Sequence, residues 1–244
     1  MAFHRSIGID SYPGTDSLCS FLTSPDLPQT PGSSITTETF NGPTPQHIAA
    51  PKKKEPALTA TDNTLEEIRL DLADCNQCSL QNSRTQIVLS TGTKEADLFI
   101  IGEWPDSDED KAGKPFQGAN GALLDLMLKA IGLTREQVFL ANIVKCRPEG
   151  DRAPNEKELK ACRPFLIRKI AVVRPKVILT MGPVAAKTML NNQEPLSRLR
   201  GRFHSFKGID LMPTFHPSFL IANPDLKKAT WLDLQMVQKK CAKR

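Results

Sequence analysis

The sequence predicts an α/β fold in which a central, mainly parallel sheet lies between two layers of helices. Two observations support this: strand and helix patterns alternate after about residue 64, and most strand patterns are nearly continuous apolar runs. Such runs are typical of parallel strands buried on both faces, because the connecting helices cover the sheet. In a sheet of this kind, functional loops lie at the carboxyl ends of the strands.

The alternation begins with a helix that starts at Thr64. Leu65, Ile68 and Leu72 recur there at helical spacing, and the stretch 74–78 ends the helix. The loops after the first two strands and the turn before Pro217 are expected to converge at one edge of the sheet. The remaining patterns are, in order, a strand over 97–101, a helix over 123–131, a strand over 138–144, a helix over 156–173, a strand over 177–181, a helix over 185–190, strands over 203–206 and 209–212, and a helix over 227–240.

Residues 1–60 are predicted to form a disordered tail, followed by one folded domain over 61–244. The tail contains eight of the chain's 19 prolines and many Ser and Thr residues, and it lacks helical or strand periodicity. Its apolar run 17–22 is interpreted as a chance cluster rather than a partner-docking segment. The net charge is +5, and the tail holds four basic and five acidic residues, so the excess positive charge lies in the folded domain. A surface that contacts phosphate would have this sign of charge.

The sequence shows no secretory-signal pattern and no apolar run long enough to cross a membrane. Acidic residues in the tail argue against a mitochondrial transit peptide. We therefore expect a cytoplasmic protein without a membrane partner, and a monomer, since no self-complementary interface is evident.

Four of the six cysteines form a candidate metal site. Cys75 and Cys78 are a C-x2-C pair in a turn, while Cys146 and Cys162 flank a polar loop that contains proline. In an intracellular chain, four thiolate ligands indicate a metal or iron-sulfur site rather than disulfides. Spacing alone does not separate zinc from a [4Fe-4S] cluster. It favours structural zinc, and unrelated buried cysteines are the other alternative.

His216 is the catalytic candidate of the C-terminal part. The apolar run 209–212 predicts a short strand, and Pro213 and Pro217 cannot donate to a central ladder. His216 is therefore expected at an exposed corner between a strand and a helix. Such a position is typical of a surface histidine as well as of a catalytic one, so the rest of the sequence decides between them.

Several motifs occur in the order found in one enzyme family. The stretch 102–110 reads GEWPDSDED, 113–118 reads GKPFQG, and 142–148 reads NIVKCRP. They resemble the family 4 uracil-DNA glycosylases, the iron-sulfur branch of the uracil-DNA glycosylase superfamily, over about residues 64–240. Shorter matches follow at 161–166, 175–178, 199–201 and 214–220.

The resemblance implies the three-layer fold of the uracil-DNA glycosylases and a monofunctional enzyme of base-excision repair. Such an enzyme hydrolyses the N-glycosidic bond of uracil in single- or double-stranded DNA, releases uracil and leaves an abasic site. The resemblance also implies that Cys75, Cys78, Cys146 and Cys162 hold a [4Fe-4S] cluster, which overturns the preference for zinc. We expect a structural role for the cluster, because base excision moves no electrons.

The same resemblance implies a uracil pocket. The base must leave the stack before its glycosidic bond can be reached. Phe116 would stack on uracil, and the amide of Asn142 would pair with O4 and N3–H, a pattern that cytosine does not offer. Backbone groups around Trp104 and Pro105 would help to hold the base, and Glu109 would support the pocket.

Glu103 and His216 are the implied catalytic residues, and both would also contact uracil. His216 would donate a hydrogen bond to uracil O2 as the departing base becomes anionic. Glu103 would lie beside the sugar, where a carboxylate could orient the attacking water and stabilise the positive charge of the sugar.

DNA contact is expected to be largely electrostatic. Basic residues gather beside Cys146, along the helix 156–173 and in the loop 198–202. Phe219 or Leu220 could enter the space left by the flipped base, and Ser218 could bind a phosphate. The expected DNA-binding residues are Lys145, Arg147, Arg200, Ser218 and Leu220.

Three departures from the family's motifs stand out. Trp104 replaces the usual alanine, Asp106 replaces a glycine, and 149–152 differs from the usual P-x-N-R loop. A bulky indole or an added carboxylate near the DNA could narrow the pocket or repel phosphate. One alternative is therefore a catalytically weak iron-sulfur DNA-binding module of the same fold, and another is a zinc-bound nucleic-acid adaptor.

Overall fold

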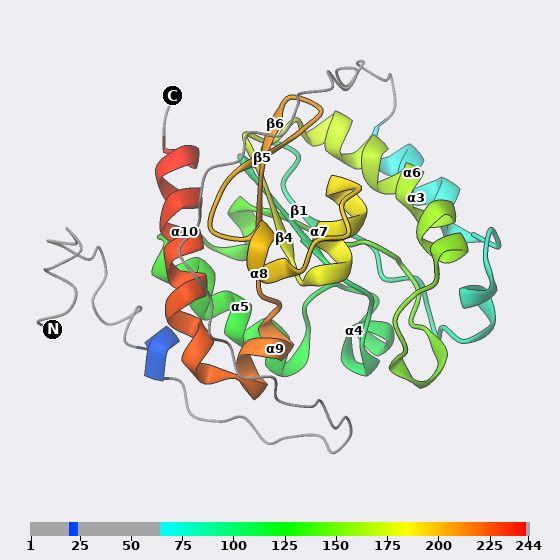
Figure 1. Cartoon of the computed structure of the whole chain (residues 1–244). Coiled ribbons are helices and arrows are strands. Elements are labelled where there is room, and N and C mark those ends of the chain that lie inside the picture. The colour runs from blue at the N-terminus through cyan, green and yellow to red at the C-terminus, as the bar shows by residue number, and fades with distance from the viewer. Residues whose placement is uncertain (1–19, 24–63, 243–244) are drawn as a thin grey trace, which may run out of the picture.

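A computed structural model describes residues 20–23 and 64–242 of the chain (Figure 1). Its centre is a six-stranded sheet with the strand order β1-β3-β2-β4-β6-β5. β2, β3, β4 and β6 run parallel, whereas β1 and β5 pair antiparallel at the two edges, so the prediction of a mainly parallel sheet is confirmed. The strands are β1 (Thr91–Gly92), β2 (Leu98–Gly102), β3 (Phe139–Asn142), β4 (Val177–Met181), β5 (His204–Phe206) and β6 (Ile209–Thr214).

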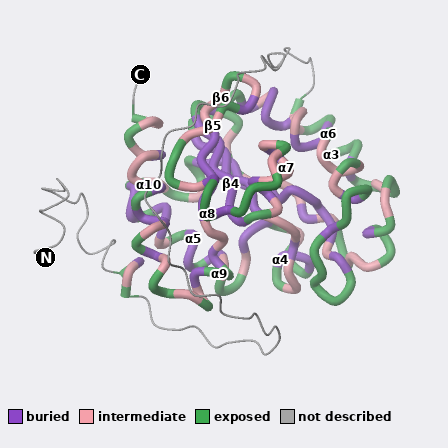
Figure 2. Tube along the Cα trace, viewed as in Figure 1, coloured by how far each residue is buried: buried purple, intermediate pink, exposed green. Residues whose placement is uncertain are grey.

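The central strands are buried because their apolar residues alternate between two cores (Figure 2). In β2, Leu98 and Ile100 belong to the first core, while Phe99 and Ile101 belong to the second. This period of two is the period of side chains along a strand. Both faces of the sheet therefore need a helical layer.

Helices cover both faces (Figure 1). Residues of α5, α9 and α10 complete the first core, residues of α6 and α7 complete the second, and α3 packs on α6. No helix in the described part of the chain is both long and apolar enough to span a bilayer. The helices are α3 (Leu65–Ala73), α4 (Ser107–Ala112), α5 (Gly118–Ala130), α6 (Glu156–Val173), α7 (Pro183–Leu190), α8 (Leu196–Leu199), α9 (Pro217–Ala222) and α10 (Lys227–Cys241), with 3-10 turns η1 (Ser79–Asn82), η2 (Arg135–Gln137), η3 (Glu149–Asp151) and η4 (Pro224–Leu226).

Two short helices, α4 and α8, have no counterpart in the sequence pattern, and α9 is expected only as the helix that follows the corner at His216. α4 begins at Asp106, whose carboxylate accepts hydrogen bonds from the backbone N–H groups of Asp108 and Glu109. Its acidic sequence has no apolar repeat, so this cap is the main local signal for a helix. α9 begins with Pro217, which is tolerated there because the first N–H of a helix has no intrahelical partner.

β6 continues through Pro213, although the sequence predicts that this strand ends at Met212. β5 pairs with β6 only as far as Leu211, so at Pro213 the strand has a neighbour on one side, in β4. Proline is tolerated where one side of a strand is unpaired.

A short helical segment over 20–23 lies within the predicted tail. Phe21 is fully buried in the first core, which also contains Trp231 and Leu234 of α10, and Leu22 packs against that core. The prediction of disorder is therefore wrong for these four residues, and 20–22 is no chance cluster. The rest of 1–60 lies outside the described residues.

We expect Phe21→Ala to lower the free energy of unfolding by about 1–3 kcal/mol. Burial of a phenylalanine side chain contributes roughly 1.5–3 kcal/mol, and the cost of ordering the segment offsets part of it. Urea unfolding followed by circular dichroism measures the change. The control is Leu70→Ala, since Leu70 is 58% exposed. An unchanged unfolding midpoint for Phe21→Ala would show that the segment does not contribute to stability.

Candidate active site and four-cysteine pocket

The candidate site lies at the carboxyl ends of the four parallel strands. Gly102 at the end of β2 pairs with Asn142 at the end of β3, and Met181 at the end of β4 pairs with Thr214 at the end of β6. The loops after these strands therefore emerge along one edge of the sheet, as predicted. A Cβ atom on Gly102 would lie 2.5 Å from Oδ1 of Asn142 and 2.8 Å from Cζ of Phe116. Glycine thus permits the close approach of two predicted pocket residues.

Glu109 ties the same two residues together. Its Oε1 atom accepts a hydrogen bond of 2.5 Å from the backbone N–H of Phe116 and one of 3.1 Å from Nδ2 of Asn142. Its Oε2 atom accepts one of 2.9 Å from the backbone N–H of Asp106. Burial raises the pKa of Glu109 to about 7, while these donors act to lower it. The contact with Nδ2 orients the Asn142 amide, which retains Oδ1 as an acceptor and a second N–H as a donor.

Phe116 has a left-handed backbone conformation with a φ of 54°. Non-glycine residues seldom adopt it, and it persists where neighbours hold it in place. Glu109 binds its N–H, and Nη2 of Arg135 donates to its carbonyl at 2.7 Å. A Cβ atom on Gly121 would lie 2.2 Å from that carbonyl oxygen. The Phe116 ring is buried and lies against His216, with ring centroids 5.8 Å apart.

His216 occupies the corner between β6 and α9, where the sequence places it, and is half-buried. Its Nδ1 lies 2.8 Å from Oγ of Ser218 and accepts the backbone N–H of Ser218 at 3.3 Å. Nδ1 is therefore the acceptor nitrogen, and Nε2 carries the proton. Burial lowers the pKa of His216 to about 4, so the ring is neutral at physiological pH. A neutral imidazole of this tautomer offers one N–H donor.

Glu103 follows β2, and its carboxylate lies at the start of α7. Oε1 accepts a hydrogen bond of 2.7 Å from the backbone N–H of Val184, and the N–H of Ala185 also donates to this carboxylate. Gly182 has a φ of 99°, and a Cβ atom there would lie 2.3 Å from the carboxylate carbon, so both conditions require glycine. Burial raises the pKa of Glu103 to about 7. Backbone donors thus fix this carboxylate in place.

The unusual residues of the first motif have local structural roles. Trp104 is half-buried and packs against the second core, whereas Phe116 belongs to the first. Pro105, the residue after Trp104, is buried. Oδ1 of Asp106 caps α4, and its Oδ2 accepts a hydrogen bond of 2.9 Å from Nδ2 of Asn120 in α5. The Trp104 indole therefore packs against the protein core, and the Asp106 carboxylate accepts hydrogen bonds from the protein's own groups.

Two side chains that were predicted to contact DNA are buried in the structure, which contradicts the prediction. Lys145 and Leu220 have only 1% and 0% of their surface exposed, because Lys145 faces the cysteines and Leu220 faces the first core. Phe219, the neighbour of Leu220 in α9, is 39% exposed. Ser218 is exposed, with its hydroxyl next to His216. Arg147 remains at the surface, paired with a carboxylate.

Arg200 belongs to a network that sequence reasoning missed. Its guanidinium donates to Oδ2 of the buried Asp233 from Nε at 3.0 Å and from Nη2 at 2.9 Å. Oγ1 of Thr214 donates to the same oxygen at 2.7 Å, and Arg200 lies over the Phe215 ring, 5.2 Å from its centroid. The Arg200 side chain remains 18% exposed beside this ion pair, so its contact with DNA stays a prediction. The network holds the two residues that precede His216.

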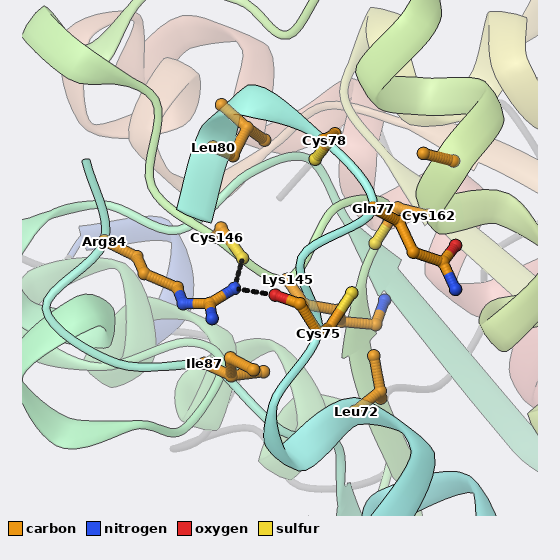
Figure 3. A pocket seen from close by; sticks show the side chains of 11 residues that line it. Leu72, Cys75, Gln77, Cys78, Leu80, Arg84, Ile87, Lys145, Cys146 and Cys162 are labelled. Atoms are coloured by element: carbon orange, nitrogen blue, oxygen red, sulfur yellow. Dashed lines mark hydrogen bonds between the residues drawn. The ribbon is translucent and has the colours of Figure 1, made fainter. Parts of the chain in front are cut away.

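The four cysteines line one pocket (Figure 3). Cys75 follows α3, Cys78 precedes η1, Cys146 follows β3 and Cys162 lies in α6. None of the four is joined in a disulfide. Among residues 20–23 and 64–242, no three His, Cys, Asp or Glu side chains are grouped so that they could hold a metal ion. The four thiols nevertheless border one shared space, and this donor set suits an iron-sulfur cluster.

Cationic side chains surround the pocket. Nη1 of Arg84 donates to Sγ of Cys146 at 3.3 Å and to the carbonyl of Cys75 at 2.8 Å (Figure 3). Lys145 lines the pocket, Lys169 lies near Cys162, and both lysines are buried. Buried cations require a compensating negative charge. The surroundings therefore fit an anionic metal-thiolate group.

The chain matches known proteins over most of the described domain. The family model "Uracil DNA glycosylase superfamily" matches residues 89–235. The chain is 38% identical over 185 residues to the Type-4 uracil-DNA glycosylase of Sulfurisphaera tokodaii, which covers 72% of this chain and 84% of that protein. It is 32% identical over 189 residues to the Type-4 uracil-DNA glycosylase of Archaeoglobus fulgidus, with 74% and 95% covered. The corresponding protein of Saccharolobus solfataricus is 36% identical over 185 residues, with 72% and 86% covered. The resemblance seen in the motifs is confirmed, and the chain belongs to the uracil-DNA glycosylase superfamily.

Proposed function

We propose that the protein is a monofunctional uracil-DNA glycosylase of base-excision repair, which hydrolyses the N-glycosidic bond of uracil in DNA and leaves an abasic site. The main support for the proposal is that Asn142, Phe116 and His216 lie close together at the carboxyl ends of the strands. The similarity to three Type-4 uracil-DNA glycosylases supports it.

The base would be read after it leaves the DNA stack. Phe116 offers the stacking face, and His216, which lies against this ring, would shift aside for the base. The free N–H of the Asn142 amide would donate to uracil O4, and Oδ1 would accept uracil N3–H. Cytosine presents an amino group and an unprotonated N3 at these positions, so its binding would leave polar groups unpaired.

His216 would stabilise the departing base. Cleavage places negative charge on uracil, and the Nε2–H of the neutral ring would donate to O2 as that charge develops. A hydrogen bond aimed at a developing charge contributes typically about 2.7–4 kcal/mol to lowering the barrier. Ser218 would maintain the required tautomer through its contacts with Nδ1.

Glu103 would act on the sugar side of the bond. Its carboxylate is held by two backbone N–H groups at the start of α7, and its remaining lone pairs could orient the attacking water. In the ionised form it would also stabilise the positive charge that develops on the sugar. Trp104 and Pro105 would contribute backbone groups to the same pocket, while Glu109 would hold Phe116 and Asn142 in place.

We also propose that Cys75, Cys78, Cys146 and Cys162 hold a [4Fe-4S] cluster. When bound, the cluster would supply structural cross-linking and no step of base excision. The ligands come from three segments of the chain, so the cluster would fix the turn after α3 and helix α6 to the loop that follows β3.

The partner is DNA that contains uracil, bound by a monomer inside the cell. The surface residues Arg147 and Ser218 remain candidates for phosphate contacts. Phe219 replaces Leu220 as the residue that could enter the space left by the flipped base, because it is the exposed one of the pair.

The proposed roles predict that kcat/KM falls as the pH falls through about 7. The pKa values of Glu103 and Glu109 are raised to about 7 by burial, and the hydrogen bonds that both accept from N–H groups are stronger in the ionised form. The pKa of His216 is about 4, so this residue stays neutral across the range and adds no second change. Rates measured from about pH 5 to pH 9 test this. Glu103→Gln and Glu109→Gln should each make the fall shallower, because each removes one of the two titrating groups, and the double variant should flatten the profile. A flat profile for the wild-type protein would contradict the ionised roles.

End-labelled oligonucleotides test the function. Each carries one uracil, either single-stranded or opposite G or A, and alkali cleaves any abasic site after incubation with the cluster-loaded protein. Cleavage confined to the uracil strands supports the glycosylase. Salt-sensitive DNA binding without cleavage would instead support the DNA-binding module, and bound zinc without iron would support the adaptor.

A further inference from the structure

Lys145 connects the two sites of the molecule. Its ammonium donates a hydrogen bond to the backbone carbonyl of Asn142, at the end of β3. The same ammonium faces the thiols of Cys146 and Cys162 in the pocket of Figure 3. The backbone carbonyl of Lys145 accepts a hydrogen bond of 2.8 Å from the N–H of Val88, so the lysine is held at both of its ends.

The charge of Lys145 has no carboxylate partner. Lys145 and Lys169 are 1% and 2% exposed, and neither forms an ion pair with Asp or Glu in the part of the chain that the structure describes. Burial lowers the pKa of both lysines, that of Lys169 to about 7, and the charge of Lys145 lowers the pKa of Lys169 further, whereas a thiolate at Cys162 acts to raise both. Two buried like charges are strongly unfavourable unless an anion accompanies them. Four thiolates around a cluster core carry a net negative charge, which would supply that anion.

We propose that Lys145 is a positioning residue that couples the four-cysteine site to the reading of the base. The anionic cluster holds the ammonium in the pocket, and the ammonium holds the Asn142 carbonyl and so the end of β3 that carries the reading amide. Lys169 contributes only its positive charge, which would offset the negative charge of the cluster. Among the described residues, no hydrogen bond links Lys169 to the residues of the uracil pocket. This inference rests on the proposed cluster and on the proposed role of Asn142.

The test compares Lys145→Met with Lys169→Met in the full-length, cluster-loaded protein. The readouts are iron per chain, the reduction potential of the cluster, and the inhibition constant of free uracil. Each variant removes one positive charge near the cluster, so both reduction potentials should become more negative. Only Lys145→Met also removes the hydrogen bond to Asn142. Its inhibition constant should rise roughly three- to tenfold, as the loss of one hydrogen bond implies, while that of Lys169→Met should stay at the wild-type value.

The coupling is overturned if Lys145→Met binds uracil as tightly as the wild type, or if Lys169→Met weakens binding equally. Should Lys145→Met fail to load iron, Lys145→Arg decides, because it keeps the charge and alters the contact with Asn142. It should retain a near wild-type potential and bind uracil more weakly, and tight binding would overturn the proposal. Failure of the proposed function has a different signature: a wild-type protein that neither releases uracil from DNA nor is inhibited by free uracil.

Discussion

Replacing His216 with alanine is expected to lower kcat for uracil release by about 10²–10³-fold, as the loss of one donor to a developing oxyanion does. The neutral ring keeps Nδ1 occupied by Ser218, so Nε2–H is the donor available to the base. KM should change much less than kcat, because the hydrogen bond strengthens as the base becomes anionic. Single-turnover kinetics on an oligonucleotide with one uracil measure the effect.

His204→Ala is the matched control for this substitution. His204 lies in β5 and is also half-buried, and its Nε2 lies 2.7 Å from the carbonyl of Leu199 at the end of α8. The control should keep wild-type kcat. A rate within a few-fold of wild type for His216→Ala itself would remove His216 from the mechanism.

The second large effect is expected for Asn142→Ala, which should lower kcat/KM on uracil by about 10²–10³-fold. The substitution removes a donor and an acceptor and leaves two polar groups of the flipped base unpaired, at roughly 1–3 kcal/mol each. It also removes a contact of Glu109, whose Oε1 accepts Nδ2 of Asn142. Competition between uracil- and cytosine-containing strands should show that the preference for uracil falls as well.

Asn192→Ala is the control for Asn142→Ala. Asn192 is half-buried, and its Oδ1 accepts a backbone N–H at 2.8 Å in the turn after α7, so its removal costs a local hydrogen bond without touching the site. If Asn142→Ala kept both its rate and its preference for uracil, another group would have to read the base.

The sheet and the position of His216 could be predicted because their signals are local. Strands β2 and β4 are apolar runs that stop at glycine, and His216 lies between two prolines after such a run. Because parallel strands end at one edge, the convergence of Asn142 and His216 follows from the strand patterns alone.

The roles of charged residues could not be predicted in the same way, because their partners are distant in sequence. Lys145 and Arg200 look like surface cations in the sequence. Asp233, which pairs with Arg200, lies 33 residues away, and the sequence gives no sign of it. The same is true of Phe21, whose binding surface is assembled from helices far along the chain.

Asp106 illustrates a different limit. As a departure from a motif glycine, it suggests interference with DNA. In the structure it caps α4 and thereby helps to hold Glu109, which accepts the Asp106 N–H in return. A motif shows which residue is unusual, whereas the hydrogen bonds of that residue show what the change does.

The measurement that tests the central claim most directly is mass spectrometry of the free base after single turnover by the cluster-loaded, full-length protein. The substrate is a duplex with one uracil opposite guanine, and the protein is in excess. The proposed function predicts one free uracil per strand, an intact phosphate backbone until alkali is added, and no release by His216→Ala on the same timescale. Protein that binds this duplex and releases no uracil would contradict the claim that the strand-end residues form a uracil-excising site.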